Sequence, residues 1–243
     1  MKLSILMPAY NEAATVGLAV KRVLDLSYPC EVELVVVNDG SRDNTSEVLA
    51  SIDDPRLVAG EHPVNRGKGA AVRTAASLAS GDYMIVFDAD LEYSPEDILN
   101  LLAPVQRGDA VVAYGVRTFG ASTAHSFWFV IGNKVNTFTA NALFNTWISD
   151  LHTCLKLMPV ALFRELPVRE KGFGLDTEIT AHLLARGHRP YEVPIYYKAR
   201  SREEGKKLTW GDGVDATWIL VRVRIREGIR NRRARRRAAR AAA

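Results

Sequence analysis

Short apolar runs alternate with helix-like segments along the first half of this chain, and this alternation restricts the fold more than any other feature. The predicted strands are 3–7, 32–37, 56–59, 83–87 and 110–114. The predicted helices are 12–26, a segment from 44, 67–79 and a segment from 94. Strands that alternate with helices in this way form right-handed βαβ units. The sequence therefore predicts an α/β fold, with a mostly parallel, Rossmann-like twisted sheet and helices on both faces.

Polar residues follow four of the predicted strands, at the edge where a parallel sheet binds its ligands. Asp88, Asp90 and Glu92 stand at alternating positions after 83–87, and a strand continued through them would space them about 7 Å apart. Three such carboxylates suit Mg²⁺ or Mn²⁺ completed by substrate phosphates. They could instead begin a loop or cap a helix. Because polar groups also follow the other strands, we prefer a binding site.

The familiar nucleotide-binding motifs are absent from the sequence. No G-x-G-x-x-G follows the first predicted strand, which disfavours a dinucleotide site. The segment 65–69 resembles a phosphate loop, but it lacks the first glycine and the final Ser or Thr of a P-loop. It can present Lys68 and the amides of a helix N-terminus to an anion. The alternative is an exposed loop that begins a helix.

The formal net charge of +4 is unevenly distributed. Residues 222–240 contain ten arginines and one acid, a local charge of +9, so the remaining chain carries −5. The basic tail, and not the body, is therefore expected to seek an anionic surface. Residues 226–243 contain no aromatic side chain for base stacking, so nucleic acid is not an expected partner.

The two cysteines and the chain's hydropathy indicate the compartment. Cys30 and Cys154 form no disulfide framework and suit a reducing environment. The sequence shows neither a signal peptide nor a run of about 20 apolar residues. We therefore expect a cytoplasmic protein, associated peripherally with the cytoplasmic face of a membrane through the segments described next.

Two segments are predicted to be amphipathic helices. In 127–148, Ile131, Val135 and Phe138 recur at helical spacing, with asparagines mostly on the other side. In 214–240, an apolar stripe runs beside an arginine stripe. Both segments could lie in an anionic membrane surface. The alternative for 127–148 is packing onto the core or onto a partner subunit, which would make the protein a homo-oligomer.

The order of four motifs resembles the family-2 glycosyltransferases of the GT-A fold, and within them the polyprenyl-phosphate sugar synthases of the dolichyl-phosphate mannose synthase group. The motifs are 8–12 (PAYNE), 37–41 (VNDGS), 65–69 (NRGKG) and 88–90 (DAD). The resemblance covers about residues 1–225. It implies a catalytic domain over 1–212, with a nucleotide-sugar half at about 1–118 and an acceptor half at about 119–212. Residues 213–243 are expected to add an amphipathic basic helix and an arginine-rich tail.

The resemblance also implies roles for individual residues. The nucleotide-sugar would be bound by Pro8, Tyr10, Glu12, Asp39, Lys68, Asp88, Ala89 and Asp90. The metal ligands would be Asp88, Asp90 and Glu92. The catalytic group would comprise Asp150, Lys156, Asp176, Glu178, Arg117, Arg200 and Lys206, with Arg202 competing for the place of Arg200. Lys156, which replaces the family's arginine, is expected to offset charge repulsion at an acceptor phosphate.

The implied activity is the inverting, Mg²⁺- or Mn²⁺-dependent transfer of one sugar from GDP-mannose or UDP-glucose to a polyprenyl phosphate. The family's processive members carry Q-x-x-R-W, which this chain lacks, so we expect one transfer per acceptor. A phosphate acceptor needs no general base, whereas a hydroxyl acceptor would need a carboxylate to take its proton. The alternative function is transfer to a soluble sugar, a glycan or a protein.

Overall fold

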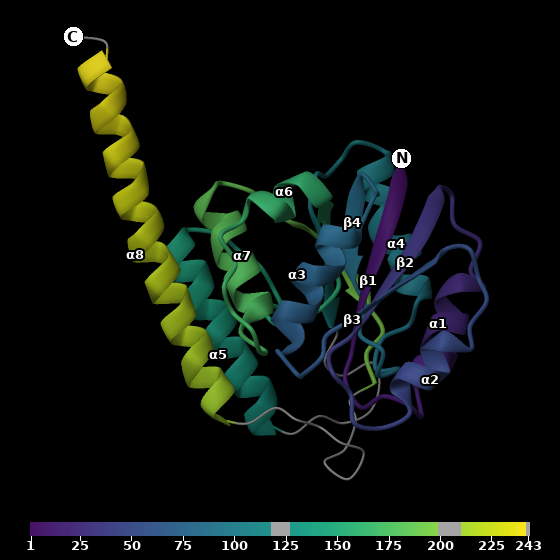
Figure 1. Cartoon of the computed structure of the whole chain (residues 1–243). Coiled ribbons are helices and arrows are strands. Elements are labelled where there is room, and N and C mark those ends of the chain that lie inside the picture. The colour runs from purple at the N-terminus through teal and green to yellow at the C-terminus, as the bar shows by residue number, and fades with distance from the viewer. Residues whose placement is uncertain (118–126, 199–209, 242–243) are drawn as a thin grey trace.

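A computed structural model of the chain describes residues 1–117, 127–198 and 210–241, and within them seven strands form one sheet (Figure 1). The strands are β1 (Lys2–Ala9), β2 (Glu31–Asn38), β3 (Leu57–Glu61), β4 (Tyr83–Val86), β5 (Ala113–Arg117), β6 (Lys156–Pro159) and β7 (Tyr191–Ile195). The helices are α1 (Val16–Leu24), α2 (Thr45–Ala50), α3 (Lys68–Leu78), α4 (Glu96–Gln106), α5 (Phe127–Phe144), α6 (Val160–Glu165), α7 (Leu175–Ala185) and α8 (Trp210–Ala241).

The sheet has the order β3-β2-β1-β4-β6-β5-β7 and is mostly parallel, as predicted. Only β6 runs antiparallel to its neighbours, β4 and β5, and the sequence did not indicate this strand. The central strands are apolar and buried on both faces: the adjacent residues Val36 and Val37 of β2, whose side chains point to opposite faces, are both fully inaccessible. This burial is the reason that residues 34–37 of β2 are all apolar.

Helices cover both faces of the sheet, which confirms the predicted α/β architecture. In Figure 1, α3, α6 and α7 lie on one face and α1, α2 and α4 on the other. Helices α5 and α8 form a further layer beyond α7. Both begin at the end of the molecule toward which β1 and β2 run, so this layer flanks the edge where ligands of parallel sheets bind.

Helix α5 is amphipathic as predicted, but its polar side faces the protein. Asn133, Asn136 and Asn141 are buried, whereas Val135 and Phe138 are 55% and 69% exposed. Each asparagine side chain is hydrogen-bonded within the protein: Asn133 donates to Asp150, Asn136 accepts from Thr217, and Asn141 pairs with the backbone of Ile148. These bonds offset the cost of burying the amides. The apolar side of α5 therefore faces outward.

Helix α8 packs beside α5 and also turns an apolar stripe outward. The Thr217 hydroxyl donates to Asn136, and Arg224 Nε donates to the Leu143 carbonyl; both contacts join residues 81 positions apart, so the two helices run parallel. The predicted stripe contains Trp218 and Ile225, which are 64% and 56% exposed. In the part of the chain that the structure describes, none of the helices has the length and apolarity to cross a membrane.

Candidate active site

The acidic segment after β4 does not continue the strand. Strand β4 ends at Val86, and Leu91 has a positive φ of 62°, which breaks the extended backbone between Asp90 and Glu92. The described residues contain no group of three His, Cys, Asp or Glu side chains that could hold a metal ion. The expectation that an extended strand delivers three carboxylates together is therefore wrong. That Asp88, Asp90 or Glu92 binds a metal stays a prediction.

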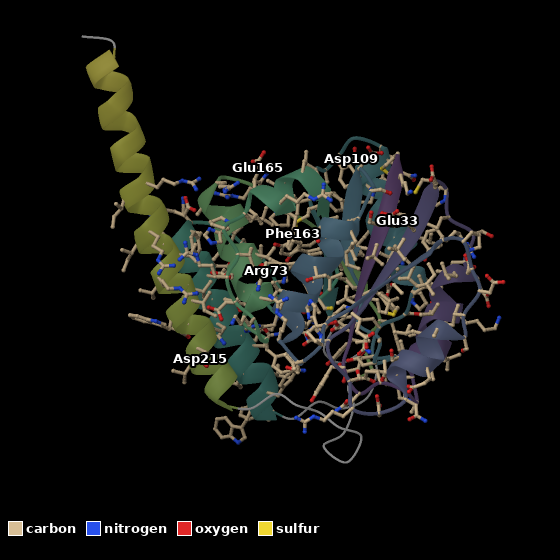
Figure 2. All side chains as sticks on the ribbon, viewed as in Figure 1. Glu33, Arg73, Asp109, Phe163, Glu165 and Asp215 are labelled. Carbon is tan, nitrogen blue, oxygen red and sulfur yellow. The ribbon has the colours of Figure 1, made fainter. Side chains whose placement is uncertain are left out.

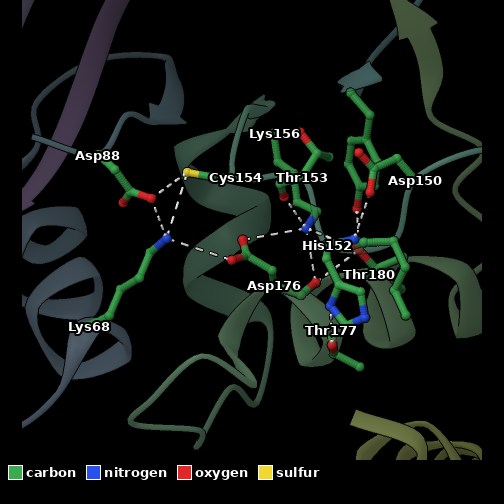
Figure 3. A network of polar contacts seen from close by, with 12 residues as sticks. Lys68, Asp88, Asp150, His152, Thr153, Cys154, Lys156, Asp176, Thr177 and Thr180 are labelled. Carbon is green, nitrogen blue, oxygen red and sulfur yellow. Dashed lines mark hydrogen bonds and ion pairs between the residues drawn. The ribbon is translucent and has the colours of Figure 1, made fainter. Parts of the chain in front are cut away.

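Lys68, at the first position of α3, lies between two carboxylates (Figure 3). Its Nζ is 2.7 Å from Asp88 Oδ2 and 3.7 Å from Asp176 Oδ2. Burial alone would lower the pKa of Lys68, but the Asp88 carboxylate outweighs it and holds that pKa well above its ordinary value. The Cys154 Sγ lies 3.1 Å from the same Asp88 oxygen, and burial raises the pKa of its thiol. Lys68 is therefore a cation at neutral pH and Cys154 a neutral donor.

Lys156 lies in the protein interior, on the far side of Asp176 from Lys68 (Figure 3). Only 1% of the side chain is exposed, and burial lowers the pKa of its ammonium group. Nζ donates to the carbonyls of Leu151, Thr153 and Asp176, at 3.1, 2.7 and 3.1 Å, and lies 3.4 Å from Asp176 Oδ1. Because these acceptors surround the ammonium group, the structure does not support the expected direct contact between Lys156 and an acceptor phosphate. The contacts instead hold Asp176 in place.

Arg117 and Asp150 form a buried, bidentate ion pair. Arg117 Nε and Nη2 lie 2.6 and 2.8 Å from the two Asp150 oxygens, and the side chains are 5% and 0% exposed. Asn133 of α5 adds a hydrogen bond of 3.1 Å to Asp150. The Tyr197 ring lies 5.0 Å from Arg117 Cζ, and its hydroxyl donates to Glu92. This group joins β5, α5 and the acidic segment after β4.

Asp39, after β2, holds the loop that precedes α3. Its carboxylate accepts hydrogen bonds from the backbone amides of Arg66 and Gly67, at 3.0 and 2.7 Å, and lies 2.6 Å from His62 Nδ1. Gly67 has a φ of 90°, a conformation that side chains with a Cβ rarely adopt. Asp39 thus fixes the turn from which Lys68 projects, and its predicted contact with the nucleotide stays a prediction.

The loops after β1 and β2 are tied to each other. Asn11 has a positive φ of 54°. Its backbone N–H donates to the Ser41 hydroxyl, and its side-chain oxygen accepts from the backbone N–H of Arg42. The predicted nucleotide-binding residues of the first loop, Pro8, Tyr10 and Glu12, are partly exposed. They lie at the carboxyl end of β1, whose neighbours β2 and β4 bring Asp39 and Asp88 to the same edge.

The remaining predicted site residues fall into three groups. Glu178 is 1% exposed and accepts hydrogen bonds from the backbone amides of Arg169 and Glu170, so it holds a loop. Ala89 is buried in the core. Arg200, Lys206 and Arg202 lie outside the described residues.

Four side chains that touch the predicted residues were given no role from the sequence. They are Cys154 against Asp88, Asn133 against Asp150, Tyr197 against Glu92 and His62 against Asp39. A single Cys, Asn, Tyr or His carries no local pattern, and each lies far along the chain from its partner. Their contacts come from the way distant segments pack together.

The comparisons with known proteins point to one family. The family model "Glycosyl transferase family 2" matches residues 4–167. The undecaprenyl-phosphate 4-deoxy-4-formamido-L-arabinose transferase of Proteus mirabilis is 34% identical over 46% of this chain and 36% of its own length. The bactoprenol glucosyl transferase of Shigella phage SfV is 36% identical over 46% of this chain and 38% of its own length. The chain thus spans between a third and two fifths of these relatives.

A solved structure shares the fold. Glucosyl-3-phosphoglycerate synthase from Mycobacterium tuberculosis, in complex with Mn²⁺, UDP and glucosyl-3-phosphoglycerate, superposes with a TM-score of 0.68 and 16% identity. The match covers 93% of this chain and 79% of that one. The predicted GT-A fold is confirmed. Since the family model also matches most of the chain, including the loops around Lys68 and Asp88, this protein belongs to glycosyl transferase family 2.

Proposed function

We propose that this protein transfers one sugar from a nucleotide-sugar, GDP-mannose or UDP-glucose, to a polyprenyl phosphate, with inversion at the anomeric carbon. The observation that carries the proposal is the cluster of Lys68, Asp88 and Asp176 at the carboxyl edge of the sheet. A nucleotide diphosphate and its cation need both a fixed positive charge and carboxylate ligands at such an edge. Two relatives are named for undecaprenyl phosphate and bactoprenol, which supports a lipid phosphate as acceptor.

Asp88 and Asp90 are the residues that would hold Mg²⁺ or Mn²⁺. Their carboxylate oxygens are the hard ligands that both ions prefer. Mg²⁺ commonly takes one or two protein carboxylates and completes its shell with phosphate oxygens and water, so a preassembled group of three protein ligands is not required. The cation, when bound, stabilises as a Lewis acid the negative charge on the departing diphosphate. The Mn²⁺ and UDP in the solved structure of similar fold support a divalent cation as cofactor.

The chain's own residues would bind and orient both substrates. Pro8, Tyr10, Glu12 and Asp39, on the loops after β1 and β2, would hold the nucleotide. The Lys68 ammonium group would lie against the diphosphate and oppose its charge. A polyprenyl phosphate is already anionic near neutral pH, so its oxygen can attack the sugar without a general base. Asp176, held by Lys156, would orient sugar hydroxyls.

The outer layer of α5 and α8 supports an acceptor that resides in a membrane. Phe138 on α5 and Trp218 on α8 are 69% and 64% exposed, and Ile225 is 56% exposed. Exposed apolar side chains on two adjacent helices favour insertion at a lipid interface. Arg226 and Arg230 are exposed on the same helix, which adds attraction to anionic lipid. We therefore propose peripheral association with an anionic membrane surface, at the cytoplasmic face.

The activity is tested with purified protein, Mg²⁺ or Mn²⁺, radiolabelled UDP-glucose or GDP-mannose, and undecaprenyl phosphate. The expected result is butanol-extractable label that disappears with EDTA and in Asp90→Ala. Release of nucleotide without lipid label would overturn the lipid acceptor. It would favour the alternative acceptors: a soluble sugar, a glycan or a protein. No label and no nucleotide release from either donor would overturn the proposed donors.

Membrane association is tested by sedimentation with phosphatidylglycerol or phosphatidylcholine vesicles. Removing two large apolar side chains from a lipid interface costs about 3 kcal/mol or more, so Phe138→Ser with Trp218→Ser should weaken vesicle binding at least 100-fold. Leu18→Ser is the matched control, because Leu18 is 51% exposed on α1, which lies on the opposite face of the sheet. If the double variant instead converts a dimer into a monomer and leaves vesicle binding unchanged, this layer is a subunit interface.

A further inference from the structure

The loop 169–172 lies directly against the start of α3. The Gly69 amide donates to the Lys171 carbonyl at 2.7 Å, and Arg73 Nη1 donates to the Glu170 carbonyl at 2.6 Å. A Cβ atom placed on Gly67 would lie 2.3 Å from the Lys171 oxygen, and one on Gly69 would lie 2.1 Å from the Glu170 oxygen. Both glycines are therefore needed for this close approach of two backbones. Figure 2 labels Arg73 on α3, on the side toward α7.

Arg222 of α8 and the buried carboxylate of Glu178 on α7 both form hydrogen bonds to this loop. Arg222 Nη2 lies 2.5 Å from Glu170 Oε1 and 3.4 Å from Glu178 Oε1. The other oxygen of Glu178 accepts from the amides of Arg169 and Glu170, at 2.6 and 2.7 Å. Glu178 thus fixes the loop's backbone, and Arg222 ties the loop's one outward carboxylate to α8.

The same loop sets the position of Lys68. Lys68 stands between the two glycines that touch the loop backbone, and its Nζ is 2.7 Å from Asp88 Oδ2. A continuous set of contacts therefore runs from Arg222 to Glu170, through the neighbouring Lys171 carbonyl to the Gly69 amide, and so to Lys68 and its partner Asp88. If the loop 169–172 moved away from α3, the backbone of residues 67–69 would lose the contacts that set the direction of the Lys68 side chain.

We infer that Arg222 and Glu170 are positioning residues: they hold the loop 169–172 against the start of α3, where Lys68 lies. They thereby couple α8 to the diphosphate end of the donor site. The inference rests on the proposed function only in treating Lys68 and Asp88 as donor-binding groups. Since charge-assisted hydrogen bonds are stronger than neutral ones, loss of this pair should loosen the loop without unfolding the protein. Donor affinity should then fall more than the rate of transfer.

The experiment compares Glu170→Gln, Arg222→Gln and Arg222→Lys with the wild-type chain. Glu165→Gln is the matched control, because Glu165 on α6 also faces an arginine, Arg186, at 3.7 Å, but lies 73% exposed. Two quantities are measured: amide hydrogen exchange across 66–73, which needs no ligand, and the affinity for UDP or GDP with Mn²⁺. Steady-state kinetics then separate KM for the donor from kcat.

In both Gln variants we expect exchange across 66–73 to accelerate about tenfold and nucleotide affinity to fall about tenfold, with kcat within threefold of wild type. Arg222→Lys should recover part of both effects, Glu165→Gln should show neither, and the double Gln variant should be no worse than either single variant. Unchanged exchange in Glu170→Gln would overturn the inference, as would a fall in kcat alone with unchanged KM. If the wild-type chain binds neither nucleotide, the donor-site assignment fails, while the exchange measurement still decides whether the pair positions the loop.

Discussion

Asp150→Asn is the substitution that best separates a structural role from a catalytic one. The wild-type carboxylate accepts from Arg117 Nε and Nη2 at 2.6 and 2.8 Å, from Asn133 at 3.1 Å and from the His152 amide at 3.2 Å. Burial alone would raise the pKa of Asp150, but the Arg117 guanidinium outweighs it and holds that pKa well below its ordinary value. The substitution removes this negative charge from beside Arg117, which is only 5% exposed.

The magnitude follows from burial. Removing one partner of a buried ion pair costs about 3–5 kcal/mol, because the remaining buried charge loses the interaction that offset its desolvation. Folded domains have only about 5–15 kcal/mol of net stability. For a chain of this size, each kcal/mol lowers the melting temperature by about 2–4 °C. We therefore expect Asp150→Asn to melt about 6–20 °C below the wild type.

The assays are urea unfolding at pH 7 for the free energy and thermal unfolding for the melting temperature, both followed by circular dichroism, with Asp109→Asn as the control. Asp109 also accepts from an arginine Nε, that of Arg107 at 2.8 Å, but these side chains are 47% and 57% exposed. The control should lose less than about 1 kcal/mol, because water solvates both charges. Equal losses in the two variants would refute the reasoning. An Asp150→Asn protein of wild-type stability without transferase activity would show instead that Asp150 acts in the chemistry.

Three further predictions concern pH, packing and a buried cation. Burial lowers the pKa of His152 to about 4, so the unfolded chain gains a proton near pH 6.5 before the native protein does. Urea titrations should therefore show the wild type losing up to about 3 kcal/mol more than His152→Gln between pH 6.5 and 4. Gly69→Ala would place a Cβ 2.1 Å from the Glu170 oxygen and should cost about 1–3 kcal/mol in thermal unfolding, whereas Gly132→Ala, with no neighbour within 4 Å, should not destabilise. Lys156→Met would remove the ammonium donor that the carbonyls of Leu151, Thr153 and Asp176 share and should cost about 2–4 kcal/mol in urea; unchanged stability would contradict the assigned positioning role.

The strands and helices of the first half of the chain, and the common edge at which their polar loops lie, could be predicted from the sequence alone, whereas β6 and β7 could not. Strand β2 could be predicted because its continuous apolar run, residues 34–37, indicates burial on both faces of the sheet. The loops after β1, β2 and β4 could be placed together because parallel strands end at one edge. The same reasoning was wrong about the acidic segment, since nothing local to the sequence indicated the positive φ of Leu91.

The partners of the buried polar groups became known only from the three-dimensional structure. Glu33 interrupts the apolar strand β2 (Figure 2), and hydrogen bonds from Ser4 and Ser80 outweigh its burial and lower its pKa to about 2. The spacing in α5 defined two faces but did not indicate which one packs inward, because the partners of Asn133 and Asn136 lie on other segments. Hydrophobic periodicity is a local signal. The hydrogen-bond partner that offsets the desolvation cost of a buried polar group lies on another segment, which only the fold brings near.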